Sequence, residues 1–168
     1  MLWSEVRLSP NHGGPRAETK GVILHSTRSG RTGPNAGEEE YELTVRYFEK
    51  PGVLASAHRV IGIRERQHAI CVIDEDRAWH AADDNDYYLG IEFCQPLPTD
   101  PYTRWQYEQG ALTVAYWSQK FGFPINTLTV ARHSDTAQGK RGRKSDPGQL
   151  FDYIGFLNRC REIRERLG

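Results

Sequence analysis

Two short apolar segments, far apart in the chain, are each followed closely by a histidine. Segment 21–24 directly precedes His25, and segment 127–130 lies just before His133. Short apolar runs of this kind, the second rich in β-branched residues, are typical of buried strands. Sites on open α/β sheets gather where the strands end. The sequence therefore predicts an α/β fold in which both imidazoles stand at strand ends.

An acidic side chain on the loop after the second histidine adds a third potential ligand. Two imidazoles and one carboxylate leave one tetrahedral position open, which is the arrangement of catalytic rather than structural zinc. A single histidine at a strand end is more often an ordinary polar residue that caps a loop. The hypothesis of a metal site therefore depends on agreement with other parts of the chain.

Five motifs, in order along the chain, resemble those of the type 2 N-acetylmuramoyl-L-alanine amidases. That family includes phage endolysins, bacterial muropeptide amidases and animal peptidoglycan recognition proteins. The resemblance extends from about residue 21 to residue 153, and five motifs in order are far more specific than any one of them. The motifs are His25-Ser26-Thr27, Ser56-Ala57-His58, Ala78-Trp79-His80-Ala81, Gly90-Ile91-Glu92-Phe93, and His133-Ser134-Asp135 with Lys144-Ser145-Asp146-Pro147-Gly148.

The resemblance implies that one zinc ion per chain is held by His25, His133 and Asp146. It also implies the reaction, which is hydrolysis of the amide that joins the lactyl group of N-acetylmuramic acid to L-alanine. The residue types alone predict only a zinc-dependent amide hydrolase. Two nitrogens and one oxygen form a donor set typical of hydrolytic zinc, and no redox ligand is present among them. We expect one amidase domain over residues 1–168, with a central mixed β-sheet flanked by about three main helices and the zinc site at the strand ends.

Glu92 is inserted between apolar neighbours in a strand expected at 89–93. A buried ionised carboxylate is costly unless it is paired or functional, so Glu92 is either the partner of a cation or a general base with a raised pKa. We predict the base, which takes a proton from the attacking water and passes it to the leaving amine. Cys94 follows two residues later, and whether this thiol approaches the metal or is simply buried stays open.

Lys144 lies two residues before Asp146, so in an extended loop both side chains project the same way. We predict that the Lys144 ammonium stabilises the oxyanion of the tetrahedral intermediate. The alternative is that Lys144 is a solvated member of the basic run 140–144.

We expect the loop around Trp79 and His80 to contact substrate, with help from Asn85. An indole supplies flat area and an imidazole supplies a hydrogen bond, although Trp79 could instead be core packing. The chain departs from many members of the family at Ala57, where they carry a catalytic Tyr just before the His. This places the acid/base role on Glu92, as in the muropeptide-amidase branch, which also resembles this chain in using Asp as third ligand.

Composition limits the other functions of the chain. The 22 acidic and 22 Lys or Arg residues give a net charge of zero, so nothing indicates nucleic-acid or general membrane affinity. No apolar run reaches the length of a transmembrane segment, and the N-terminus lacks the pattern of a signal peptide. Three scattered cysteines favour a reducing compartment. We expect a monomer made in the cytoplasm, which acts on the cell wall after release if it is an endolysin.

Helical spacing predicts a first helix from residue 38, with Tyr41, Val45 and Phe48 on its apolar face. Further helices are predicted at 103–121 and 150–167, the latter with Phe151, Ile154, Leu157 and Arg161 on one stripe, and residues 1–20 as an extended arm. Three biological roles are compatible with these motifs. We favour a phage-type endolysin over a cytosolic recycling amidase for anhydro-muropeptides and over a non-catalytic peptidoglycan-binding module.

Overall fold

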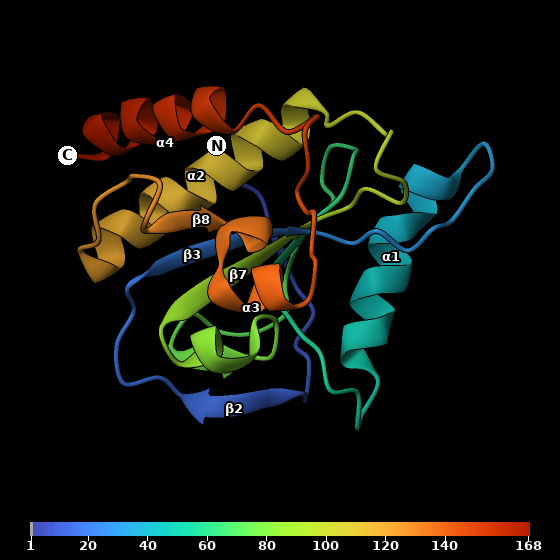
Figure 1. The fold of residues 1–168 in the computed structure, drawn as a ribbon, viewed down its shortest axis with the longest axis horizontal. Helices are drawn as coiled ribbons and strands as arrows, with labels where there is room; N and C mark the ends of the chain where they lie inside the picture. Colours follow the sequence, from blue (N-terminus) through green and yellow to red (C-terminus); the bar gives the residue numbers. More distant parts are fainter. Residues whose placement is uncertain (1) are drawn as a thin grey trace.

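The computed structural model describes residues 2–168 and consists of a mixed β-sheet with helices on both faces (Figure 1). The six strands of the main sheet run in the order β1-β5-β4-β7-β3-β8. Their bounds are β1 Glu5–Val6, β3 Gly21–Ser26, β4 Arg59–Ile61, β5 His68–Ile70, β7 Tyr88–Phe93 and β8 Val130–Arg132. The helices are α1 Ala36–Glu49, α2 Arg104–Phe121, α3 Ala137–Arg141 and α4 Tyr153–Leu167, with 3-10 turns at Ala82–Asp86 and His133–Asp135. The predicted fold class is therefore confirmed.

The centre of the sheet is parallel. Strand β3 pairs in parallel with β7 on one side and with β8 on the other, and β7 pairs in parallel with β4. The antiparallel pair β4–β5 makes the sheet mixed. Because the carboxyl ends of β3, β7 and β8 point the same way, the residues that follow these strands meet at one edge of the sheet.

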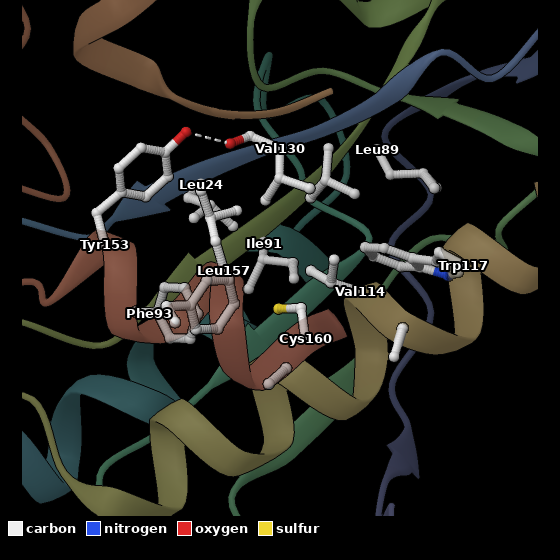
Figure 2. Packing of buried hydrophobic residues seen from close by; sticks show 14 of the residues in the cluster. Leu24, Leu89, Ile91, Phe93, Val114, Trp117, Val130, Tyr153, Leu157 and Cys160 are labelled. Atoms are coloured by element: carbon white, nitrogen blue, oxygen red, sulfur yellow. Dashed lines mark hydrogen bonds between the residues drawn. The ribbon is translucent and has the colours of Figure 1, made fainter. Parts of the chain in front are cut away.

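Helices α2 and α4 lie side by side over one face of the sheet (Figure 1). Figure 2 shows how Leu24, Ile91 and Phe93 from the strands pack against Val114 and Trp117 of α2 and against Leu157 and Cys160 of α4. The Tyr153 hydroxyl also donates a hydrogen bond to the Val130 carbonyl oxygen at 2.6 Å. Burial of these side chains is the main stabilising term for this layer.

Helix α1 covers the opposite face. Its buried residues Tyr41, Val45 and Phe48 are those predicted from the spacing, and they pack on Val60 and Ala69. Val60 and its neighbour Ile61 belong to different clusters because successive side chains of a strand leave opposite faces. Residues on the same face as Val60 therefore point towards the α1 side.

The N-terminal segment forms more secondary structure than an extended arm. Strand β1 adds to the edge of the main sheet beside β5, and β2 (His12–Pro15) pairs antiparallel with β6 (Asp76–Ala78) in a second, two-stranded sheet. Met1 of the predicted arm lies outside the described residues. Between the two strands, the Asn11 side chain donates to the carbonyl oxygens of Phe48 and Lys50, which ties the arm to the end of α1.

Two sequence-based boundaries were wrong. The segment 127–129 is a turn rather than part of a strand, and Leu128 is 79% exposed. Helix α4 begins at Tyr153, after the Asp152 cap, so Phe151 precedes the helix and Ile154 faces solvent. The buried stripe of α4 consists of Tyr153, Phe156, Leu157, Cys160 and Ile163.

No helix within residues 2–168 is both long enough and apolar enough to cross a membrane.

Candidate active site

Strand pairing brings together three of the predicted functional side chains. His25 in β3 is paired with Glu92 in β7, and both point to the α1 side because Leu24 and Ile91 fill the core on the other face. The pairing of Leu24 with Arg132 puts His133, the next residue after β8, beside His25. The two imidazole ring centroids are 4.3 Å apart.

Asp146 joins the two histidines from the loop after α3. Nδ1 of His133 lies 3.0 Å from Oδ2 of Asp146, and Nδ1 of His25 lies 3.5 Å from the same oxygen. One ligand atom from each of these three residues lies within 4.8 Å of the other two. The side chains are buried, with residue exposures of 2% for His25, 5% for His133 and 7% for Asp146.

This donor set fits a zinc ion. Two imidazole nitrogens and one carboxylate oxygen supply three ligands and leave a fourth position open, which is the pattern of hydrolytic zinc. The ligand atoms are close enough for one ion to contact all three, since zinc bonds to nitrogen and oxygen are about 2.0–2.2 Å long. The residues present therefore fit the metal that the sequence predicts, although Cys94 is absent from the cluster found among the described residues.

The charges of the three groups are coupled. Burial alone would raise the pKa of Asp146, but the neighbouring His133 and His25 side chains outweigh it and hold that pKa far below its usual range. Burial lowers the pKa of His25, while for His133 the Asp146 carboxylate outweighs burial and raises the pKa. The aspartate is thus ionised and His25 is neutral at ordinary pH, as metal ligands must be.

Glu92 lies beside this cluster and opens onto a groove. Burial, reinforced by the charges of Asp146 and Glu40, raises the pKa of Glu92 well above its ordinary value. Its Oε2 atom is buried without a hydrogen-bond partner in the described part of the chain. A carboxyl group with a raised pKa and an unpaired oxygen is suited to accept a proton and return it during hydrolysis.

The groove has a volume of about 460 Å³ and runs between α1 and the loop that follows β3. Glu92 connects the groove with the three candidate metal ligands, because Glu92 lines the groove and is paired with His25 in the sheet. The other residues that line the groove are Thr27, Ser29, Arg31, Glu40, Leu43, Thr44, Tyr47, Phe48 and Ala55.

His80 contacts a metal-ligand candidate directly. Its Nδ1 lies 2.9 Å from Nε2 of His25, and its Nε2 lies 3.0 Å from the Tyr88 carbonyl oxygen. Both ring nitrogens therefore have protein partners. Burial lowers the pKa of His80 well below its ordinary value, so the ring is uncharged at neutral pH.

The other two residues predicted to contact substrate flank His80. Asn85 Oδ1 accepts hydrogen bonds from the backbone N–H groups of His80 and Ala81, at 3.0 and 2.7 Å, and so holds this loop. Trp79 is half-buried, and its backbone N–H donates to Ser56 Oγ.

Lys144 is exposed, and its ammonium hydrogen-bonds no described residue. It is near enough to lower the pKa of His25, of His133 and of Glu92 by its charge. The loop around it is held by a hydrogen bond from the Lys144 backbone N–H to the Gly139 carbonyl oxygen at 2.8 Å.

Gln138 was missed by the sequence reasoning. It lies on the short helix α3, and its Oε1 is 2.6 Å from Nε2 of His133. A glutamine in a polar segment carries no signal of such a contact, which arises because α3 begins at the Thr136 cap, close to His133.

Comparisons with known proteins agree with these features. Residues 15–149 match the N-acetylmuramoyl-L-alanine amidase family. N-acetylmuramoyl-L-alanine amidase A of Achromobacter lyticus is 30% identical over 91 residues, which are 54% of this chain and 45% of that protein. The matched part thus spans less than half the length of this curated relative.

Several solved structures share the fold. A selenomethionine derivative of AmpD superposes with a TM-score of 0.69 at 23% identity, over 94% of this chain and 93% of that chain. A mutant endolysin from Bacillus subtilis has a TM-score of 0.68 at 18% identity, over 95% and 99% of the two chains. AmiD from E. coli, in complex with the substrate anhydro-N-acetylmuramic acid-L-Ala-D-γ-Glu-L-Lys, has a TM-score of 0.67 at 17% identity, over 86% and 58%. The family match covers most of the chain, and the chain belongs to the N-acetylmuramoyl-L-alanine amidase family.

Proposed function

We propose that the protein is a zinc-dependent N-acetylmuramoyl-L-alanine amidase that cleaves the lactyl–L-alanine amide of peptidoglycan. The observation that carries this proposal is the juxtaposition of three buried donors within 4.8 Å of one another with a carboxyl group that opens onto a groove. Family membership supports the choice of bond.

His25, His133 and Asp146 would hold the metal, which when bound supplies Lewis acidity toward the scissile carbonyl group and a more acidic water. Glu92 takes one proton from the attacking water as the oxygen bonds to the carbonyl carbon. It then gives that proton to the alanine nitrogen as the carbon–nitrogen bond breaks. The products are a lactyl carboxylate and a free amine at L-alanine.

Lys144 would stabilise the negative charge that develops on the carbonyl oxygen, because its ammonium has no competing protein partner among the described residues. The groove between α1 and the β3 loop would take part of the substrate, since about 460 Å³ falls in the range of small-ligand pockets, about 300–1,000 Å³. We assign Trp79, together with the loop held by Asn85, to the wall of the substrate site.

The natural substrate is proposed to be intact peptidoglycan, as for a phage endolysin. Solved structures of both an endolysin and a muropeptide-binding amidase share this fold. The alternative is a recycling amidase that cleaves soluble anhydro-muropeptides.

The decisive experiment is mass spectrometry of products from purified sacculi and, in parallel, from a soluble anhydro-muropeptide. We expect free stem peptides that begin with L-alanine, loss of product after treatment with a chelator, and recovery on addition of zinc. Faster release from sacculi supports the endolysin role, whereas cleavage of the soluble substrate alone assigns recycling. Stoichiometric zinc without any released peptide would make the protein a peptidoglycan-binding module.

A further inference from the structure

The hydrogen bonds around His25 determine which of its nitrogens faces Asp146. The Tyr88 carbonyl oxygen can only accept, so the Nε2 atom of His80 must carry the proton that joins them at 3.0 Å. With its proton at Nε2, the His80 ring has a lone pair at Nδ1, 2.9 Å from Nε2 of His25. His25 then donates from Nε2, and its Nδ1 is the nitrogen that faces Asp146, at 3.5 Å from Oδ2.

The same arrangement is repeated at His133 with a different partner. Gln138 Oε1 lies 2.6 Å from Nε2 of His133, and an amide oxygen only accepts. Nε2 is therefore the protonated nitrogen, and Nδ1 faces Asp146 Oδ2 at 3.0 Å. Each imidazole thus has its Nε2–H held by an acceptor and its Nδ1 directed into the cluster.

Two glycines allow these acceptors to approach so closely. A Cβ on Gly90 would lie 2.7 Å from Cγ of His80, so the ring rests directly on the backbone of β7. A Cβ on Gly139 would collide with the His133 carbonyl oxygen, so α3 packs directly against the backbone of His133. These two close approaches hold the His80 ring against β7 and the backbone of α3 beside His133.

We propose that His80 and Gln138 are positioning residues that hold the Nε2–H groups of His25 and His133 and thereby select Nδ1 of each ring as the metal ligand. This inference rests on the metal site of the proposed function. Acceptors behind ligating histidines fix the ring orientation and make the facing nitrogen more basic, and their loss typically weakens metal affinity about 10–100-fold.

The first test measures zinc affinity of the metal-free protein by competition with a chromophoric chelator. Gln138→Leu keeps the approximate size of the side chain and removes the acceptor, and we expect binding about 10–100-fold weaker. Gln138→Glu keeps an acceptor and is expected to bind zinc at least as tightly as the wild type. Gln149→Leu, at an exposed position, is the matched control. Equal affinity of the Gln138→Leu variant and the wild type would overturn the role of Gln138.

His80 is tested by His80→Phe, which keeps a flat ring on Gly90 but has no nitrogen. We expect a comparable loss of zinc affinity, and no loss for His12→Phe at an exposed position. Thermal unfolding of each metal-free variant separates the two possible roles of the residue. A purely structural role would lower the unfolding temperature without a specific loss of affinity in the folded protein, and that result would contradict the proposal.

A second measurement applies to the wild type and needs no variant to fold. Long-range ¹H–¹⁵N spectra of the zinc-loaded protein report which ring nitrogen carries hydrogen. We expect Nε2–H for both His25 and His133, and a protonated Nδ1 in either ring would overturn the assignment. Because neither measurement involves turnover, a protein that shows these results but releases no peptide would contradict the proposed activity alone.

Discussion

His25 and Glu92 occupy paired positions on the neighbouring parallel strands β3 and β7, and their side chains leave the same face of the sheet. The backbones of the two strands are about 4.8 Å apart, the usual spacing in a sheet. The candidate metal ligand His25 therefore lies next to Glu92, whose pKa is raised. The two functions are separable, because Glu92 is not part of the three-residue cluster.

The first prediction concerns turnover in Glu92→Gln. Removing the proton acceptor should lower kcat by about 10²–10⁴-fold, the usual contribution of general acid–base catalysis. Zinc content, measured by atomic emission, should stay at one per chain. Glu39→Gln, the same change at an exposed position of α1, should leave both quantities unchanged. Wild-type rates in the Glu92→Gln variant would remove Glu92 from the mechanism.

The second prediction concerns the stability of the same variant in the absence of metal. Burial raises the pKa of Glu92 in the folded protein, whereas the unfolded chain ionises near the ordinary value of 4.5. Above that pH the unfolded state releases a proton that the folded state retains, so ionisation favours unfolding. Glu92→Gln should therefore have the higher free energy of unfolding at pH 7, and the difference should shrink as the pH falls through 4.5. Urea titrations at about pH 4 and pH 7 measure the difference in free energy of unfolding between the variant and the wild type. An equal difference at both pH values would contradict the prediction.

The third prediction separates two aspartates near His133. Asp146→Ala should abolish stoichiometric zinc binding, because it removes one of three ligands and the only anionic one. Asp135→Ala should bind zinc normally, since Asp135 is exposed and pairs with Arg132 on the surface. Equilibrium dialysis with zinc tests both variants. Full occupancy in the Asp146→Ala variant would mean that another group, such as Cys94, acts as the third ligand.

The fourth prediction concerns the basic loop. Lys144→Gln should lower kcat by about 10²–10³-fold, as does loss of one oxyanion donor in other hydrolases, with zinc affinity nearly unchanged. Lys140→Gln lies in the same basic run and should keep wild-type kcat. Steady-state rates on a soluble muropeptide compare the two, and equal losses would indicate that the run acts only through its total charge.

The fifth prediction checks the face that α4 buries. Leu157 is 1% exposed and Ile154 is 61% exposed. Leu157→Ala should lower the free energy of unfolding by about 2–5 kcal/mol through loss of burial and creation of a cavity. Ile154→Ala should change it by no more than about 0.5 kcal/mol. Chemical denaturation measures both, and the opposite ranking would require a different rotation of the helix.

The sequence was sufficient for the fold class and for the apolar face of α1, because the spacing of Tyr41, Val45 and Phe48 reports directly which side is buried. It failed at the start of β8. Asn126 Oδ1 accepts hydrogen bonds from the backbone N–H groups of Leu128 and Thr129, and this turn outweighs the strand preference of the segment.

For the site, spacing and resemblance identified side chains that the structure brings together from residues 25, 92, 133 and 146. Spacing and resemblance could not identify the residues that hold these side chains in place. The contact of His80 with His25 depends on the absence of a side chain at Gly90, and that of Gln138 with His133 depends on the tight approach of α3. Such contacts follow from three-dimensional packing, and no periodic pattern in the sequence predicts them.

The position of β3 between β7 and β8 has a consequence for biosynthesis. Strand β3 acquires its β8 neighbour, and the His25 imidazole meets Asp146, only after more than a hundred residues beyond His25 have been made. At the proposed metal site, ion capture would therefore follow synthesis of the segment from Val130 to Asp146, because a translation product that ends before Val130 lacks two of the three candidate ligands.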